Sequence, residues 1–125
     1  MLDFFFKTKK YEDKLDRLYP QLGHNKRCAC CGASAEHIHH IIPRANKLLR
    51  WDVNNLLPLC AKCHQRVHDR KERFIISPVR RKYLKEMKNK DFKQYLIEQG
   101  LTREDFYKLK EQQLNLSLIH ISEPT

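Results

Sequence analysis

The sequence has no apolar run of about 18 residues, the length that a membrane-spanning helix needs. Its first stretch, MLDFFFKTKK, has too few apolar residues, placed too early, for a secretory signal peptide. We therefore expect a soluble, cytoplasmic protein with no membrane partner. Acidic residues are also scarce: 15 Asp and Glu stand against 25 Lys and Arg, and the net charge of +10 favours a polyanionic partner, most simply nucleic acid.

Repeats and low-complexity linkers are absent as well, which at 125 residues predicts one domain with a modest core. The last ten residues, LSLIHISEPT (116–125), are unusual. They can be written back as CTG TCT CTT ATA CAC ATC TCC GAG CCC ACG, which is similar to the transposase adapter used to prepare sequencing libraries. We therefore interpret residues 116–125 as an artefact, exclude His120 as a ligand, and expect the authentic domain at residues 1–115.

Periodicity and capping signals predict a mixed α+β fold. Apolar residues at helical spacing predict a first helix that Pro20 ends. Two short strands are expected at residues 35–42 (AEHIHHII) and 55–60 (NLLPLC), followed by a helix at residues 61–72. Further helices are expected within about 78–113, with Ser77, Asp91 and Thr102 as N-caps and Gly100 as a stop.

The five cysteines indicate metal binding, because disulfides are rare in a reducing compartment and an odd number cannot pair fully. Two Cys-x-x-Cys pairs, Cys28 with Cys31 and Cys60 with Cys63, supply the four thiolates of a structural zinc site. A strand and a loop inserted between the pairs would bring them together. Buried or redox-active thiols are the alternative, and Cys30 is expected to be a bystander.

The histidines form a second pattern. His39 and His40 are adjacent near the end of the first predicted strand, and His64 follows Cys63 directly. His68 lies one helical turn beyond His64, so both can reach one ion from the same helix face. His37 alternates with its neighbour and is interpreted as a solvent-facing strand residue.

Together, the motifs CACCG, HHIIPR and NNLLPLCAKCHQRVH resemble the HNH endonucleases over residues 27–68. The resemblance implies a ββα-metal core at about 27–72, which zinc knuckles stabilise and helices flank. By position, His40 corresponds to the general base and Asn55 to the residue that steadies it. His39 and His64 correspond to ligands of a catalytic metal, and His68 to a third ligand or a phosphate-binding histidine.

The implied chemistry suits these residue types. Hydrolysis of a phosphodiester needs a base for the attacking water, and histidine, with an ordinary pKa of about 6.5, is largely neutral at cellular pH. A divalent ion, Mg²⁺, Mn²⁺, Ni²⁺ or Zn²⁺, can stabilise the charge on the phosphate and the leaving group. A base at the end of a strand also needs its ring oriented, and an Asn on the partner strand can supply that hydrogen bond.

The basic residues suggest how double-stranded DNA would bind. Arg44 and Lys47 in the loop, and Arg66 and Arg70 on the following helix, are candidate phosphate contacts, with a solvated surface as the alternative. Trp51 is expected to pack under the loop. Small proteins of this kind resemble phage, prophage and mobile-element nucleases. The rival interpretation is a non-catalytic zinc-knuckle module that binds nucleic acid. Target sequence, nicking or double-strand cleavage, and oligomeric state stay open.

Overall fold

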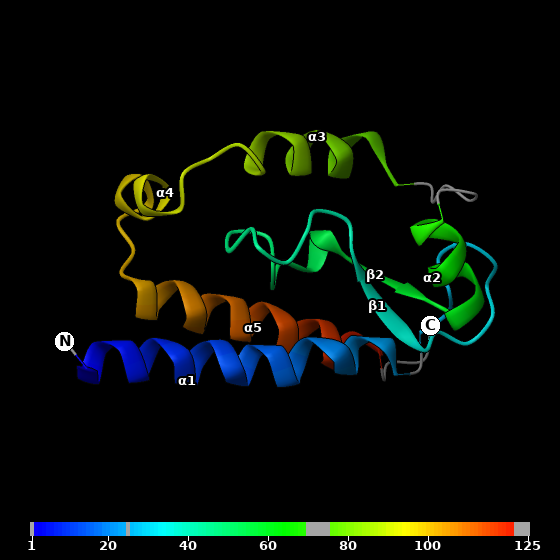
Figure 1. Cartoon of the computed structure of the whole chain (residues 1–125), viewed down its shortest axis with the longest axis horizontal. Coiled ribbons are helices and arrows are strands. Elements are labelled where there is room, and N and C mark those ends of the chain that lie inside the picture. The colour runs from blue at the N-terminus through cyan, green and yellow to red at the C-terminus, as the bar shows by residue number, and fades with distance from the viewer. Residues whose placement is uncertain (1, 25, 70–75, 122–125) are drawn as a thin grey trace.

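A two-stranded sheet and five α-helices make up the part of the chain that this computed structural model describes, residues 2–24, 26–69 and 76–121. In order, the elements are α1 (Leu2–Leu18), the 3₁₀ helix η1 (Tyr19–Gly23), β1 (His37–His40), the 3₁₀ helix η2 (Val53–Asn55), β2 (Leu56–Leu59), α2 (Ala61–His68), α3 (Pro78–Met87), α4 (Phe92–Gln99) and α5 (Arg103–Ile121). Helices α1 and α5 run side by side along one side of the molecule, and α3 and α4 lie on the other (Figure 1). The hairpin and α2 lie between them at one end, so the predicted α+β class is confirmed.

The predicted helix caps are all present. Ser77 and Asp91 each accept a hydrogen bond from a backbone N–H in the first turn of α3 and α4. Thr102 does the same at the start of α5. Gly100 ends α4 at a φ of 67°, a left-handed conformation that glycine adopts without a steric cost. These local signals set where the flanking helices begin and end.

The central elements are shorter than predicted. The strand expected at 35–42 is regular only over His37–His40, because it pairs with the four-residue β2, and Asn55 belongs to η2 instead of that strand. The helix expected at 61–72 ends at His68, with Asp69 as its C-cap. Residues 70–72 of that prediction lie outside the described part of the chain.

The hairpin separates the strand histidines onto two faces. Side chains alternate along a strand, so His37 and His39 share one face, toward α2, and Ile38 and His40 share the other. The second face packs against η1, where the Tyr19 ring meets the His40 ring edge-on at a centroid distance of 5.0 Å. The antiparallel register pairs these four strand residues, in order, with Leu59, Pro58, Leu57 and Leu56.

The main core lies between the helices and the loop that joins the strands. Trp51 in this loop is 0% exposed, which confirms that it packs under the loop. Its ring meets the Tyr107 ring of α5 at a centroid distance of 5.6 Å. The other fully or nearly buried members of this core are Leu15, Leu22, Leu48, Leu49, Leu56, Leu84, Met87, Leu96, Phe106 and Leu114.

A buried carboxylate ties the loop to α3 and α5. Asp52 is 2% exposed and accepts a hydrogen bond from the backbone N–H of Asn54 at 2.9 Å. It also accepts a hydrogen bond from the Tyr83 hydroxyl and pairs with the buried Lys110 ammonium at 3.4 Å. Burial and this carboxylate raise the pKa of Tyr83, so the phenol stays protonated and able to donate.

We expect Tyr83→Phe to lower the free energy of unfolding by about 1.5–3 kcal/mol, the usual range for a hydrogen bond to a charged group. Urea denaturation followed by circular dichroism measures the change. Tyr95→Phe is the matched control, because the Tyr95 hydroxyl has no hydrogen-bond partner among the described residues. Equal stability of the Tyr83 variant and wild type would show that this network contributes nothing.

The last helix runs further than predicted. α5 continues past the expected end near residue 113 to Ile121, into the segment interpreted as an artefact. Leu118 packs partly against the core, whereas Leu116 and Ile119 are each 57% exposed. Among the described helices, α5 included, none combines the length and apolar character that crossing a membrane requires.

Candidate functional site

Four cysteine sulfurs converge where the hairpin meets α2. Cys28 and Cys31 come from the loop before β1, whereas Cys60 is the N-cap of α2 and Cys63 lies in its first turn. Their Sγ atoms all lie within 4.8 Å of one another. Gly32, with a φ of 80°, turns the chain directly after Cys31. The fold therefore brings together the two pairs predicted from their spacing.

The electrostatics of this four-cysteine cluster fit a divalent cation. Burial raises the pKa of Cys28, but hydrogen bonds from the backbone N–H groups of Cys60, Cys31 and Cys30 lower it to about 6 overall. Burial and the neighbouring sulfurs raise the pKa of Cys63. Thiolates this close repel one another unless a cation neutralises them, and four thiolates are a preferred shell for Zn²⁺. The cluster is therefore consistent with a zinc site.

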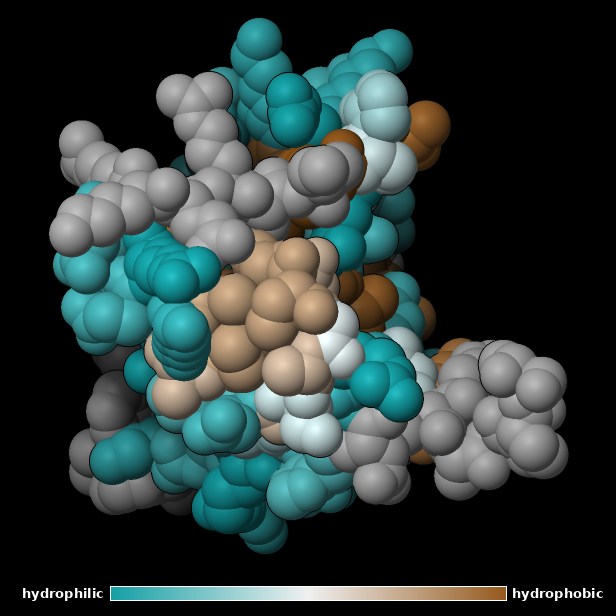
Figure 2. Space-filling model, turned by 90° about the vertical axis from the view of Figure 1, so that its right-hand side faces the viewer, coloured by the Kyte–Doolittle hydropathy of each residue, from teal (hydrophilic) through white to brown (hydrophobic). Residues whose placement is uncertain are grey.

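Most of the cluster is shielded from solvent. Cys28, Cys60 and Cys63 are buried against Leu57 and Leu59 of β2 in a second, smaller core. Figure 2 shows the end of the molecule that carries this loop and α2, where a weakly apolar patch has hydrophilic residues on its left and lower sides. Exposed small residues of the loop and of the start of α2 are Ala29, Ala33 and Ala61. Because three of the four sulfurs are buried, we expect a metal bound there to exchange slowly with metal in solution.

Three histidines form a second cluster across the hairpin. His39 of β1 faces His64 and His68 of α2, with ring centroids 5.3 and 5.5 Å away. One ring nitrogen of each lies within 4.8 Å of the others. The Nε2 atoms of His64 and His68 are 3.0 Å apart, as the one-turn spacing on α2 predicts. The chain thus places together the three histidines predicted from their spacing.

Two members of this three-histidine cluster, His39 and His64, are held as neutral imidazoles. Burial, followed by the nearby His64, His68 and His40, lowers the pKa of His39 to about 4. Burial and the neighbouring histidines also lower the pKa of His64. Neutral imidazole is the form that binds a divalent metal. The donor set therefore fits a divalent ion with nitrogen ligands.

His40 lies on the opposite face of β1 and is held by a backbone carbonyl. Its Nε2 is 2.8 Å from the carbonyl oxygen of Arg50. Because a carbonyl can only accept, Nε2 carries the proton and Nδ1 keeps a free lone pair. Burial lowers the pKa of His40, which keeps the ring neutral at pH 7. His40 can therefore accept a proton at Nδ1.

The predicted hydrogen bond from Asn55 to His40 is wrong. The Asn55 side chain is fully buried and bonds to the backbone instead: its oxygen accepts from the Ile42 N–H at 2.7 Å, and its nitrogen donates to the carbonyls of Ile42 and Leu49 at 3.0 Å each. These bonds clamp both ends of the loop that presents the Arg50 carbonyl. Asn55 thus holds the loop, and the loop orients His40.

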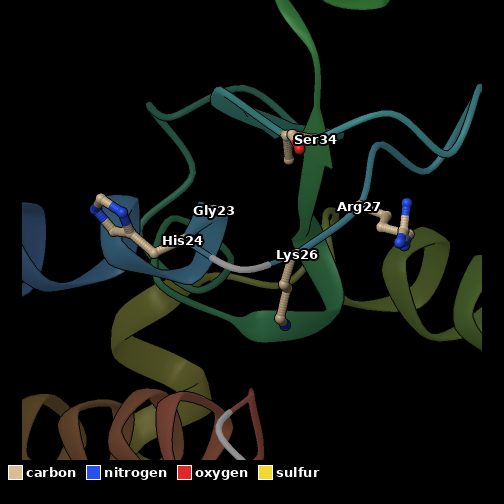
Figure 3. Close-up of a pocket in the computed structure, with 6 residues that line it drawn as sticks. Gly23, His24, Lys26, Arg27 and Ser34 are labelled. Atoms are coloured by element: carbon tan, nitrogen blue, oxygen red, sulfur yellow. The ribbon is translucent and has the colours of Figure 1, made fainter.

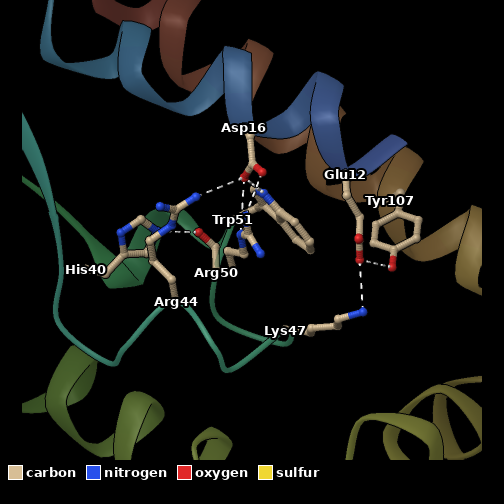
Figure 4. A network of polar contacts seen from close by, with 8 residues as sticks. All are labelled: Glu12, Asp16, His40, Arg44, Lys47, Arg50, Trp51 and Tyr107. Atoms are coloured by element: carbon tan, nitrogen blue, oxygen red, sulfur yellow. Dashed lines mark hydrogen bonds and ion pairs between the residues drawn. The ribbon is translucent and has the colours of Figure 1, made fainter. Parts of the chain in front are cut away.

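Acidic residues of α1 fix the same loop from outside (Figure 4). The Arg50 guanidinium donates to both carboxylate oxygens of Asp16, at 3.2 and 2.6 Å. The Trp51 indole N–H donates to Asp16 at 2.9 Å, and the Arg44 guanidinium lies 3.9 Å from it. Lys47 pairs at 3.1 Å with a second α1 carboxylate, that of Glu12, which also accepts a hydrogen bond from the Tyr107 hydroxyl. Asp16 thereby anchors the residue whose carbonyl holds His40.

Three of the four basic side chains predicted to contact DNA lie in the described part of the chain. Arg44 and Lys47, predicted to contact DNA, are partly neutralised by the α1 carboxylates described above. Arg66 is exposed on α2 and has an interaction within the fold. Arg70 lies outside the described residues.

A separate pocket of about 310 Å³ lies beside η1 and the loop before β1. Figure 3 shows Lys26 and Ser34 in its middle, with His24 and Arg27 pointing outward on either side. None of the described residues that line it is acidic; its other members are Gly23 and Ala35. Burial and the charge of Arg80 lower the pKa of Lys26. The pocket is therefore a positively charged surface open to solvent.

Three contributors to the histidine sites were missed at the level of sequence. His37 is exposed, as predicted, but its Nδ1 lies 2.9 Å from the Nδ1 of His64. The period of two in the strand, which places it on the face of His39, was the available signal. The Arg50 carbonyl and Asp16 carry no such signal, because their contacts with the site depend on the loop and on α1.

Known proteins match the central part of the chain. Residues 28–70 match the family model described as HNH endonuclease. The mitochondrial DNA mismatch repair protein mutS homolog of Sarcophyton glaucum is 41% identical over 49 residues, which cover 35% of this chain. The match spans only 5% of that protein. No solved structure matches the chain significantly.

Proposed function

We propose that the chain is a metal-dependent endonuclease that hydrolyses phosphodiester bonds of double-stranded DNA, because residues 28–70 match the HNH endonuclease family model. One observation carries the proposal: a neutral histidine held in one tautomer, His40, directly follows His39, the strand member of a cluster of three ligand-type histidines. A module that only binds nucleic acid would not need this pairing. The matched relative, which its name links to DNA repair, is consistent with DNA as the substrate.

His40 acts as the general base. Its Nε2–H is held by the Arg50 carbonyl, so Nδ1 removes the proton from the attacking water. Asn55 keeps the loop clamped, and Tyr19 packs edge-on against the ring. The base is thus oriented before substrate binds, which limits its motion relative to the phosphate.

His39, His64 and His68 would hold the catalytic ion. A divalent ion bound there, Mg²⁺, Mn²⁺, Ni²⁺ or Zn²⁺, supplies positive charge for the phosphate and the departing oxygen. Burial and mutual repulsion lower the pKa of His39 and His64, which leaves the nitrogens of these two rings free to bind. Cys28, Cys31, Cys60 and Cys63 would hold a structural zinc that joins the loop before β1 to α2 and so places His64.

The charge of the chain suits a DNA backbone. With a net charge of +10, the protein attracts phosphates independently of sequence. The pocket lined by Lys26 and Arg27 is one place where phosphates can bind, beside the face of β1 that carries His40. Arg44, Lys47, Arg66 and Arg70 are the further proposed contacts. We also propose a cytoplasmic nuclease of phage, prophage or mobile-element type, since unpaired zinc-binding thiols suit a reducing compartment.

DNA affinity should fall steeply with salt, because each phosphate contact releases about 0.9 counterion. We expect Lys26→Gln to reduce the slope of log affinity against log salt by about 1 for every sequence tested. Lys47→Gln should change the slope less, because Glu12 lies 3.1 Å from Lys47 and already balances its charge. Fluorescence anisotropy with uncleaved duplexes at several salt concentrations measures both slopes. Equal effects of the two variants would contradict this assignment.

We expect Asp16→Ala to reduce cleavage about 10- to 100-fold by loosening the loop that orients His40, since small misplacements of a catalytic group have effects of this size. Asp13→Ala, an exposed change on the same helix, is the matched control. Initial rates are compared at equal fraction folded, checked by circular dichroism. A stable Asp16 variant that cleaves at the wild-type rate would show that the contact between α1 and the loop does not affect the orientation of His40.

Nuclease activity is tested with supercoiled plasmid, single-stranded DNA and RNA in separate reactions, each with Mg²⁺, Mn²⁺, Ni²⁺, Zn²⁺ or EDTA. The proposal predicts nicked or linear plasmid in the presence of at least one metal and none in EDTA. DNA binding without cleavage in any metal would instead favour the zinc-knuckle binding module.

A further inference from the structure

We propose that His37 is a positioning residue that orients His64 for metal binding. The inference rests on the metal-binding role proposed above. His37 begins β1, and the alternation of the strand places it on the same face as His39, toward α2. Its ring meets the His64 ring at a centroid distance of 5.0 Å and an interplanar angle of 69°. It is exposed on its outer side.

His64 is contacted at both ring nitrogens. Its Nε2 lies 3.0 Å from the Nε2 of His68, on the side of the three-histidine cluster. Its Nδ1 lies 2.9 Å from the Nδ1 of His37. The two nitrogens of an imidazole point in different directions, so the contact with His37 leaves the cluster side of the ring open to an ion.

These contacts assign the proton on His64. A nitrogen that binds a metal carries no hydrogen, so binding through Nε2 leaves the proton of the neutral ring on Nδ1. That N–H then needs an acceptor, and the Nδ1 of His37 is at hydrogen-bond distance. His37 therefore accepts through Nδ1 and turns its own N–H, at Nε2, toward solvent. In this arrangement one tautomer and one ring orientation of His64 are favoured.

His37 does not belong to the ligand group itself. The three ligand nitrogens that lie within 4.8 Å of one another come from His39, His64 and His68. His37 instead contacts the side of His64 away from His68. Partners of this kind, usually carboxylates or carbonyls, typically affect metal affinity 10- to 100-fold.

The experiment is calorimetric titration with Ni²⁺ of protein whose cysteine cluster is filled with zinc. His37→Leu removes the acceptor and is expected to weaken Ni²⁺ binding about 10- to 100-fold. His37→Gln supplies an amide oxygen that can accept from His64, so it should keep most of the affinity. His24→Leu, an exposed histidine after η1, is the matched control and should bind as wild type does. Zinc content and thermal unfolding of every variant are measured alongside.

Wild-type Ni²⁺ affinity in His37→Leu would overturn the proposal. An equal loss in His37→Leu and His37→Gln would overturn it too, because the loss would then follow from the missing ring and not from a missing acceptor. If the wild type binds no Ni²⁺, the positioning role fails together with the metal site. If it binds Ni²⁺ but cleaves no DNA, the nuclease proposal fails, while a weaker His37→Leu rescued by Gln still supports the role of His37.

Discussion

Replacing His40 with Ala is expected to slow DNA cleavage by about 10²- to 10⁴-fold, the usual contribution of a general base. The variant should keep its affinity for metal and for DNA. His40 faces η1, whereas the three-histidine cluster faces α2, so its removal leaves the ligand nitrogens in place. Single-turnover cleavage of supercoiled plasmid gives the rate, and calorimetry gives the metal affinity.

His64→Ala is the matched comparison, because it removes a proposed ligand and leaves the base. It should lose cleavage together with binding of the divalent ion, whereas His40→Ala loses cleavage alone. Should His40→Ala cleave at the wild-type rate in a preparation free of contaminating nuclease, the assigned base is wrong, and His37 or His68 becomes the next candidate.

Replacing Cys60 with Ser is expected to release zinc and unfold the hairpin with α2. The binding free energy of structural zinc in small domains is about 10–16 kcal/mol, comparable to the whole stability of a typical domain. Cys60 has a second role as the N-cap of α2, where its sulfur accepts from the Cys63 N–H at 3.4 Å. Bound zinc per chain and the far-ultraviolet circular dichroism spectrum together measure the effect.

Cys30→Ser is the control for this experiment, because Cys30 is not one of the four clustered sulfurs. It should keep its zinc and its fold. The opposite pattern, zinc lost from Cys30→Ser and retained in Cys31→Ser, would overturn the assignment of the first cysteine pair.

Features encoded by neighbouring residues could be predicted from the sequence. The caps at Ser77 and Asp91, the two cysteine pairs and the His64–His68 spacing all depend on fixed local geometry, and the structure contains each of them. The meeting of the two cysteine pairs was also predicted, because a strand and a loop inserted between them can bring both pairs to one place.

Contacts between distant segments could not be predicted in the same way. His40 donates its hydrogen bond to the Arg50 carbonyl, and backbone groups carry no signature in the sequence. Asn55 has the amide groups to bond either to His40 or to the loop, and only the path of the loop decides between them. The pairing of Arg44 with Asp16 depends on how α1 packs against the loop. This packing partly neutralises a positive charge that the sequence alone suggests is available to bind DNA.

In the proposed mechanism, cleavage depends on a removable ion at the three-histidine cluster, distinct from zinc at the cysteine cluster. The most direct measurement follows plasmid cleavage and bound zinc in one sample, before and after brief EDTA treatment and after divalent ions are restored. We expect EDTA to abolish cleavage while one zinc per chain remains, and a divalent ion to restore cleavage. Cleavage that persists after EDTA, or that never occurs in any metal while DNA still binds, would contradict it.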